Sequence, residues 1–280
     1  DIASGSIARL VDVKDPVIYS VTSLAWDPDS RMLFYTTDNS AYRDLVSLDP
    51  ATGRHRVLQK DARIGDLAFN RADRSLWGIR HLNGIATFVR IPPPYTDWKQ
   101  VHSFPYGEVP YDLDVSPDGT LVACSFGQVN GQQTVRVFDT TALLKSEVKP
   151  VAEFDFGSAA VPNNFVFSPD GRFLYGSAYL TGVSNIYRYE IATKKTEAVT
   201  NAETGFFRPV PLGGDDLLVF RYSGKGFVPA RITATPISDL GTITFFGTRV
   251  VENHPVLKEW NVATRTPADY DTLKKRTGDY

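Results

Sequence analysis

Short alternations of apolar and polar residues, each closed by a cluster of turn-forming residues, recur along most of the chain. The two clearest copies are residues 115–119 and 167–171, in which an apolar residue is followed by Ser-Pro-Asp-Gly. Proline fixes φ and glycine tolerates positive φ, so each cluster predicts a tight turn between two strands. Weaker copies of the pattern begin at Trp26, Phe69 and Val210. The pattern therefore predicts a chain built from repeated short strands.

The spacing of these copies defines the repeating unit. Counted from Trp26, Phe69, Val115, Phe167 and Val210, the steps are 43, 46, 52 and 43 residues. A period of about 40 to 50 residues is typical of the four-stranded blade of a β-propeller. A β-sandwich also contains short strands, but it gives no reason for the same turn to recur after the same strand. We therefore predict an all-β fold, a β-propeller of four-stranded antiparallel blades with five recognisable repeats.

The fourth repeat contains the expected parts of one blade. Its apolar, aromatic and β-branched residues predict strands at 164–167, 173–177, 185–191 and 196–200. Polar or turn-forming residues separate these strands, as a meander of antiparallel strands requires.

The two ends of the chain do not match whole blades. Residues 6–13 alternate like a strand, so we predict that residues 1–20 hold the orphan outer strand of an incomplete blade. Residues 21–252 are predicted to form the five blades, the last closing with a strand at 242–250, and residues 253–280 a linker or tail. An open arc would expose two sheet edges, so we expect a ring of about six to eight blades. Because the first residue is not Met, we interpret the chain as processed or as a segment of a longer protein.

Composition and charge exclude several kinds of partner. The 30 Lys and Arg residues nearly balance the 32 Asp and Glu residues, so the chain lacks the basic character that nucleic acid or an anionic membrane surface requires. The longest apolar runs are far shorter than a membrane span, so we predict no direct span in this segment. A single cysteine, Cys124, cannot form an internal disulfide or a multi-thiolate metal site, and we expect it to be a buried small hydrophobic residue.

Several stretches of the repeats resemble a known family. The sequences FVFSPDGRFLYGSAY (residues 165–179) and IYRYEIATKK (residues 186–195), with LDVSPDGTLV and SLDPATGRHRVL, resemble the WD-like propeller repeats of TolB-type bacterial periplasmic proteins. The resemblance covers about residues 20–250. It implies a periplasmic or cell-surface bacterial protein. It also implies a segment of a larger extracytoplasmic chain, in which a propeller joins a peptidase-like region to a membrane-associated region.

Polar and aromatic side chains gather in the loops that would form the rim and channel mouth of a propeller. These loops precede the first strand or join the second and third strands of each repeat, and they also contain Tyr179 and Phe207. Guanidinium, amide and aromatic groups in one concavity suit recognition of a protein, peptide or glycan. The simpler alternative is that they are solvated loop tips. The predicted binding residues are Asp66, Arg80, His81, Tyr111, Asp112, Asn163, Asn164, Arg208, Arg221 and Tyr222.

Two enzymatic alternatives remain open. An asparagine before Phe-Ser-Pro-Asp-Gly is similar to the repeat of metal-dependent lactonases and gluconolactonases. That resemblance implies a lactonase-like hydrolase in which Asp66, Asp112 and Asn163 or Asn164 hold a hard cation such as calcium in the central channel. The glutamate that such sites use at the start of the first blade is missing from residues 21–24. The other alternative is the propeller side domain of a peptidase.

Recognisable catalytic motifs are absent from the sequence. It contains no Gly-x-Ser-x-Gly elbow, and none of its four histidines belongs to a His-Glu-x-x-His run. We therefore predict that this segment is a non-catalytic scaffold or binding module without a cofactor, with calcium as the alternative.

Overall fold

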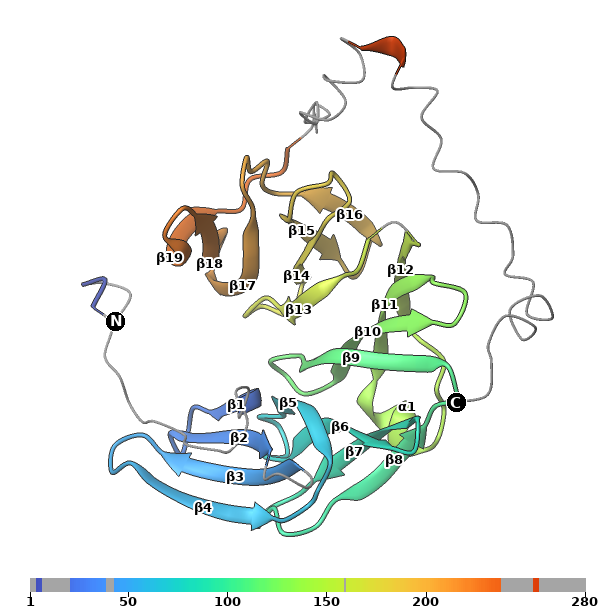
Figure 1. The fold of residues 1–280 in the computed structure, drawn as a ribbon. Coiled ribbons are helices and arrows are strands. Elements are labelled where there is room, and N and C mark those ends of the chain that lie inside the picture. Colours follow the sequence, from blue (N-terminus) through green and yellow to red (C-terminus); the bar gives the residue numbers. More distant parts are fainter. Residues whose placement is uncertain (1–3, 7–20, 39–42, 159, 238–253, 257–280) are drawn as a thin grey trace, which may run out of the picture. The chain divides into compact units, whose positions relative to one another are not determined.

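The computed structural model describes residues 4–6, 21–38, 43–158, 160–237 and 254–256 (Figure 1). The chain divides into two compact units, Asp1–Leu240 and Gly241–Tyr280. In the second unit only residues 254–256 are described. The predicted strand at 6–13 lies, except for Ser6, outside the described residues, as do the strand predicted at 242–250 and the predicted domain boundaries.

The first unit contains five antiparallel sheets, each formed by consecutive strands. We number the sheets as blades 1 to 5 in chain order. Blade 1 consists of β1 (Val21–Asp27), β2 (Met32–Asp38), β3 (Arg43–Asp49) and β4 (Arg54–Gln59). Blade 2 consists of β5 (Ile64–Phe69), β6 (Leu76–Leu82), β7 (Ile85–Ile91) and β8 (Lys99–Ser103). Blade 3 consists of β9 (Glu108–Val115), β10 (Leu121–Gln128), β11 (Gln133–Asp139) and β12 (Ala152–Gly157).

Blade 4 repeats this plan and confirms the strands predicted for the fourth repeat. It consists of β13 (Asn163–Phe167), β14 (Phe173–Ala178), β15 (Asn185–Glu190) and β16 (Lys195–Ala198). Blade 5 has three strands among the described residues, β17 (Phe206–Gly213), β18 (Asp216–Ser223) and β19 (Gly226–Thr233). The helix in the described part, α1 (Thr140–Leu144), is one short turn between β11 and β12. The all-β propeller fold is thus confirmed. No helix in the described ranges has the length and apolar character needed to cross a membrane.

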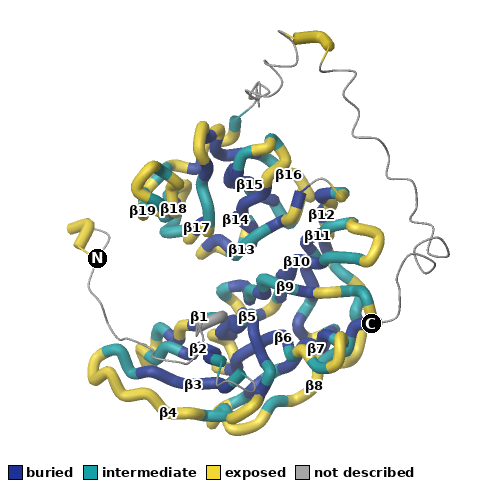
Figure 2. The backbone as a smooth tube through the Cα atoms, in the orientation of Figure 1, coloured by how far each residue is buried: buried dark blue, intermediate teal, exposed yellow. Residues whose placement is uncertain are grey.

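The core lies between neighbouring blades. One apolar cluster joins blades 1 and 2, a second joins blades 2 and 3, a third joins blades 3 and 4, and a fourth joins blades 4 and 5. Because successive side chains of a strand point to opposite faces, one strand supplies two of these clusters. In β6, Leu76 packs in the cluster with blade 1, whereas Trp77 packs in the cluster with blade 3. Figure 2 shows the result: a middle strand such as β3 is largely buried, whereas the outer strand β4 is exposed.

The predicted Ser-Pro-Asp-Gly turns close in the same way in blades 3 and 4. The N–H of Gly119 donates to the carbonyl of Ser116 at 2.8 Å, and that of Gly171 donates to Ser168 at 2.9 Å. Both glycines have positive φ, 74° and 72°. Each serine hydroxyl donates to the aspartate two residues later. The turn therefore requires this combination of residues, which explains why it recurs in the sequence.

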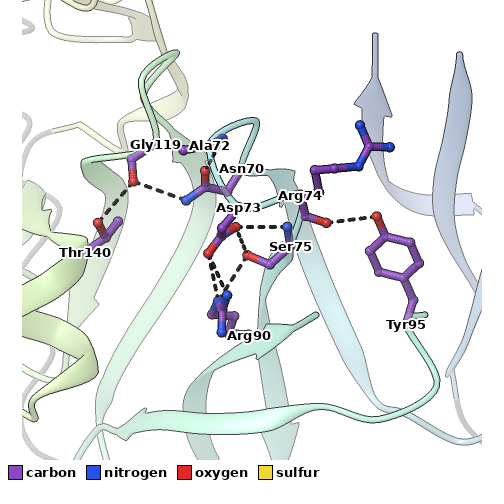
Figure 3. A network of polar contacts seen from close by, with 9 residues as sticks. All are labelled: Asn70, Ala72, Asp73, Arg74, Ser75, Arg90, Tyr95, Gly119 and Thr140. Carbon is purple, nitrogen blue, oxygen red and sulfur yellow. Dashed lines mark hydrogen bonds and ion pairs between the residues drawn. The ribbon is translucent and has the colours of Figure 1, made fainter. Parts of the chain in front are cut away.

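The corresponding turn of blade 2 uses asparagine to reach the next blade (Figure 3). The buried Asn70 accepts from the N–H of Ala72 at 2.9 Å and donates through Nδ2 to the carbonyl of Gly119 in blade 3 at 3.1 Å. The hydroxyl of Thr140 donates to the same carbonyl at 3.0 Å. This contact fixes the turn of blade 2 against the turn of blade 3.

Candidate functional site

The innermost strands of blades 2 to 5 share a backbone irregularity. Asp66, Asp112, Asn164 and Arg208 have φ values of 49°, 52°, 51° and 48°. At each of them the pairing with the second strand shifts register, as in a β-bulge. Left-handed φ is uncommon outside glycine and is tolerated best by asparagine and aspartate. Bulges of this kind re-aim a side chain out of the regular alternation of the strand.

These bulge residues connect one blade to the next. Asp66 Oδ1 accepts the main-chain N–H of Asp112 at 3.2 Å, and Asp112 Oδ2 accepts the N–H of Asn164 at 2.8 Å. The side chain of Asn164 also donates to Asp112 Oδ1 at 3.3 Å. Two residues after Asp112, the carboxylate of Asp114 accepts the N–H of Phe167 at 2.8 Å. Each carboxylate thus satisfies a main-chain donor of the innermost strand of a blade, at the bulge for Asp66 and Asp112 and beyond the bulge for Asp114.

The inner strands enclose a cavity of about 370 Å³, which we call the central cavity. All five blades contribute to its lining. Its polar lining residues are Ser23 of blade 1, Asp66 of blade 2, Asp112 and Asp114 of blade 3, Asn164 of blade 4 and Arg208 of blade 5.

Burial changes the acid–base behaviour of the carboxyl groups in the central cavity. It raises the pKa of Asp66, although the amide of Asp112 and the charge of Arg43 act in the opposite direction. It also raises the pKa of Asp112, against the hydrogen bond from Asn164, and the charge of Asp66 adds to the increase. Burial raises the pKa of Asp114 to about 6. The cavity therefore holds its carboxyl groups in an environment that disfavours their ionised form.

A second pocket, of about 520 Å³, lies between blades 4 and 5. We call it the aromatic pocket. Its ring-bearing residues are in contact, since the Phe207 ring centroid lies 6.1 Å from that of Tyr179 and 5.2 Å from that of Phe227. Tyr179 is 48% exposed and Phe227 59% exposed. The lining residues are Asn163, Asn164, Ser177, Tyr179, Ser184, Phe207, Arg208, Phe220 and Phe227.

The structure brings four of the predicted binding residues together in the central cavity, and of the two asparagines only Asn164 lines that cavity. Asp66, Asp112, Asn164 and Arg208 line the central cavity. Asn163 lines the aromatic pocket but not the central cavity, and it donates through Nδ2 to the carbonyl of Val161 at 3.2 Å. Asn164 is therefore the equivalent of Asp66 and Asp112, because Asn164 has the positive φ of the bulge. A sequence without that backbone information cannot distinguish two adjacent asparagines.

Other predicted binding residues lie away from both cavities. The guanidinium of Arg80 stacks over the ring of Trp98 at 4.7 Å, and its buried Nε has no hydrogen-bond partner among the described residues. Burial lowers the pKa of His81, with a further decrease from the charge of Arg43. The hydroxyl of Tyr111 donates to Gln133 at 3.0 Å.

Two predicted residues of β18 lie near the aromatic pocket without lining it. The Tyr222 ring lies 5.3 Å from the ring of Phe227, and Arg221 is exposed to solvent. By contrast, Phe220 and Phe227 line the pocket but are absent from the predicted set. The signal that points to them is the number of aromatic residues in β17 to β19, because solvent-exposed edge strands usually carry polar or charged side chains.

The calcium hypothesis fits this arrangement poorly. Three of the four carboxylate oxygen atoms of Asp66 and Asp112 already accept N–H groups. In blade 5 the equivalent position holds a cation, Arg208. Within the described ranges no group of three or more His, Cys, Asp and Glu side chains is suited to hold a metal ion. Binding of calcium by Asp66, Asp112 and Asn163 therefore stays a prediction without support from the geometry.

Comparison with known proteins shows the fold of the chain. No protein-family profile and no curated protein matches it by sequence. Among solved structures, TolB from Acinetobacter baumannii is similar with a TM-score of 0.60 and 18% identity over 76% of this chain and 52% of that chain. A putative TolB from Agrobacterium tumefaciens has a TM-score of 0.58 and 16% identity over 78% of this chain and 72% of that chain.

A gluconolactonase from Xanthomonas campestris is also similar, with a TM-score of 0.54 and 16% identity over 77% of this chain and 73% of that chain. The chain thus spans about half the length of the TolB chain from Acinetobacter baumannii. At these identities the likeness shows a TolB-like β-propeller fold and confirms the resemblance at that level.

Proposed function

We propose that this chain is a non-catalytic recognition module that binds a peptide segment of a partner at the mouth of the central cavity. The observation that carries the proposal is the junction of the two cavities. Asn164 and Arg208 line both the polar central cavity and the aromatic pocket. A ligand at this junction meets hydrogen-bonding groups on one side and exposed rings on the other.

The chemistry of the junction suits a peptide. Aromatic rings supply large rigid contact area at low entropic cost, and guanidinium and amide groups bind carboxylates and main-chain groups. Pockets of about 300 to 1,000 Å³ with apolar walls and a few convergent polar groups are typical of ligand sites, and the aromatic pocket has about 520 Å³. A glycan also stacks on aromatic rings, and we treat it as an outcome of the test.

The location that we propose for this module is the bacterial periplasm or cell surface. This proposal is supported by the likeness of the fold to TolB structures.

The experiment is a screen of immobilised random peptides and a glycan array with the whole chain, followed by calorimetry on the strongest binder. We expect a peptide to bind and Phe227→Ala to weaken its binding. Tyr106→Ala is the matched control, because Tyr106 is an 80% exposed ring outside the aromatic pocket. Binding of glycans alone, or equal loss with both variants, would contradict the proposal.

A metal-dependent hydrolase is the second candidate, since the carboxylates of Asp66, Asp112 and Asp114 line one cavity. Calorimetric titration of the chain with calcium chloride tests it. Stoichiometric binding that Asp112→Asn abolishes would favour the hydrolase over the recognition module.

A further inference from the structure

We infer that the aromatic pocket binds the carboxyl-terminal residue of a peptide, with its α-carboxylate on the Arg208 guanidinium and a large apolar side chain against the rings. This inference rests on the proposed function, because it names the part of the peptide that the junction of the two cavities recognises. It goes further in that it assigns one chemical class of ligand, whose carboxylate binds Arg208 and whose apolar side chain contacts the rings of the pocket.

The first argument is the state of Arg208. This residue is exposed, lines both cavities, and makes no side-chain hydrogen bond or ion pair within the part of the chain that the structure describes. Other arginines of the blades are paired: Arg136 bonds Glu153 at 2.8 Å, and Arg188 bonds Glu197 at 2.8 Å. A guanidinium is a planar fork that matches a carboxylate with two parallel hydrogen bonds. Arg208 is therefore an available anchor for an anion at the edge of the pocket.

The second argument is the backbone at Arg208. Its φ of 48° repeats that of Asp66, Asp112 and Asn164, yet arginine lacks the short polar side chain that stabilises this conformation locally. Strain of this kind persists where the surrounding structure enforces it, and it is common at ligand sites. The bulge directs the side chain of residue 208 toward the same cavity that the three equivalent residues line.

The third argument is that the nearest acidic group is already engaged. Both carboxylate oxygen atoms of Asp112 accept hydrogen bonds from Asn164. The charge of Arg208 lowers the pKa of Asp112, against the larger increase caused by burial, but among the ion pairs of the described residues there is none between the two side chains. No carboxylate of the described residues forms an ion pair with Arg208, and a ligand carboxylate would fill this role.

The fourth argument is the aromatic lining of the pocket. Phe207 and Phe227 meet edge to face at 5.2 Å, with an interplanar angle of 88°, and both remain accessible from the pocket. Exposed rings that line a concave site favour an apolar or aromatic side chain. In a carboxyl-terminal residue the α-carboxylate and the side chain are both attached to the Cα atom. One terminal residue can therefore contact Arg208 with its carboxylate and the rings with its side chain. An internal Asp or Glu would present a carboxylate without the apolar group.

Asn163, another polar residue of the pocket lining, suits the main chain of such a terminal residue. The side-chain carbonyl oxygen of Asn163 makes no hydrogen bond among the described residues, whereas its Nδ2 bonds Val161. That oxygen is available to accept the N–H of the terminal residue. Capture of a carboxyl terminus beside an apolar pocket is an established mode of peptide recognition.

The test uses acetylated peptides of sequence Ser-Gly-Ser-Gly-X, with each amino acid in turn at X, prepared both as free acids and as carboxamides. Calorimetry with the whole chain gives the affinities. We expect binding of the free acids with Phe, Tyr, Trp or Leu at X, and about ten- to a hundred-fold weaker binding of their carboxamides, as the loss of a charge-assisted hydrogen bond predicts. Arg208→Gln should remove this difference, and Arg208→Lys should reduce it.

Arg221→Gln is the matched control, because Arg221 is also an exposed arginine of blade 5 without an ion pair among the described residues, but it does not line the pocket. It should leave the preference for the free acid unchanged. Equal affinity for the free acid and the carboxamide would overturn the inference, and so would a preference for the free acid that persists in Arg208→Gln. In either case the binding of a peptide would still support the proposed function. Absence of binding by these peptides, when the random-peptide screen does find a ligand, would also overturn the inference alone. Failure of both screens would overturn both.

Discussion

The carboxylate of Asp112 accepts the main-chain N–H of Asn164 at 2.8 Å, and the two residues occupy the same bulge position in successive blades. A side chain of one blade therefore supports the irregular backbone of the next. The same relationship joins Asp66 to Asp112 at 3.2 Å. Asp66, Asp112 and Asn164 thus form a chain of contacts across blades 2 to 4, so they contribute both to the lining of the central cavity and to its stability.

The contact between Asp112 and Asn164 predicts a cost for its removal. Asp112→Ala leaves the main-chain N–H of Asn164 in a partly buried site without its acceptor, so the free energy of unfolding should fall by about 1 to 3 kcal/mol. Urea unfolding followed by fluorescence measures this. Asp97→Ala is the control, because Asp97 is exposed and accepts only a long 3.4 Å bond from Thr96. Similar stability of the two variants would show that the contact between blades contributes little.

Asp114 predicts a dependence of stability on pH. Its pKa is about 6 in the folded chain against the ordinary 3.8, because burial disfavours the carboxylate. Between these pH values the folded chain keeps a proton that the unfolded chain loses, so the free energy of unfolding falls as the pH rises from about 4 to about 6 and is then constant. Asp114→Asn should flatten this decrease and increase stability at pH 7 by at most about 3 kcal/mol.

The measurement is a series of urea titrations across this pH range for the wild type, Asp114→Asn and the exposed control Asp97→Asn. Asparagine keeps a side-chain oxygen that accepts the N–H of Phe167, so the variant should fold. A pH profile identical to that of the wild type would contradict the raised pKa of Asp114.

The two Ser-Pro-Asp-Gly turns offer a matched pair of glycines. Gly119 and Gly171 both have φ near 70°, so alanine is strained at either position. At Gly119 an added Cβ would lie 2.2 Å from Asn70 Oδ1, whereas at Gly171 its nearest neighbour would be Pro117 at 3.9 Å. Figure 3 shows why, since Asn70 bonds the carbonyl of Gly119 directly. Gly119→Ala should therefore destabilise the chain clearly more than Gly171→Ala, by about 1 to 3 kcal/mol.

Thermal unfolding of both glycine variants measures this difference. The variant Gly171→Ala controls for the cost of positive φ alone, which is about 1 kcal/mol. Equal decreases in stability for the two variants would mean that Asn70 and the turn of blade 2 shift away from the added Cβ without an energetic cost.

Cys124 should be unreactive in the folded chain. Its side chain is fully buried in the cluster between blades 2 and 3, which confirms the expected role as a small hydrophobic residue. Burial raises the pKa of its thiol, with a further increase from the charge of Asp66. Because the thiolate is the reactive form, Ellman's reagent at pH 8 should react with it only after unfolding.

A Val129→Cys variant supplies the positive control, since Val129 is 82% exposed. Rapid labelling of wild-type Cys124 without denaturant would show that blades 2 and 3 separate readily.

The sequence by itself determined the blades. The alternation of apolar residues and the Ser-Pro-Asp-Gly turns depend on neighbouring residues, and they predicted the strands of blade 4 to within one or two residues at each end. Local rules of this kind act over a few residues, so they can be read without knowledge of the fold. The candidate residues Asp66, Asp112 and Arg208 also followed from their place before the first strand of each repeat.

Only the tertiary structure decided which of these residues act together. The choice of Asn164 over Asn163 depends on a bulge whose donor is satisfied by a carboxylate 52 residues earlier. Arg80, a rim residue by sequence, stacks on Trp98 instead. The aromatic pocket joins residues of all three described strands of blade 5 with residues of β13 and β14 and the loop after β14, and no local pattern places Tyr179 beside Phe207. Contacts across blades link residues about one repeat apart, and their geometry exists only once the blades have packed.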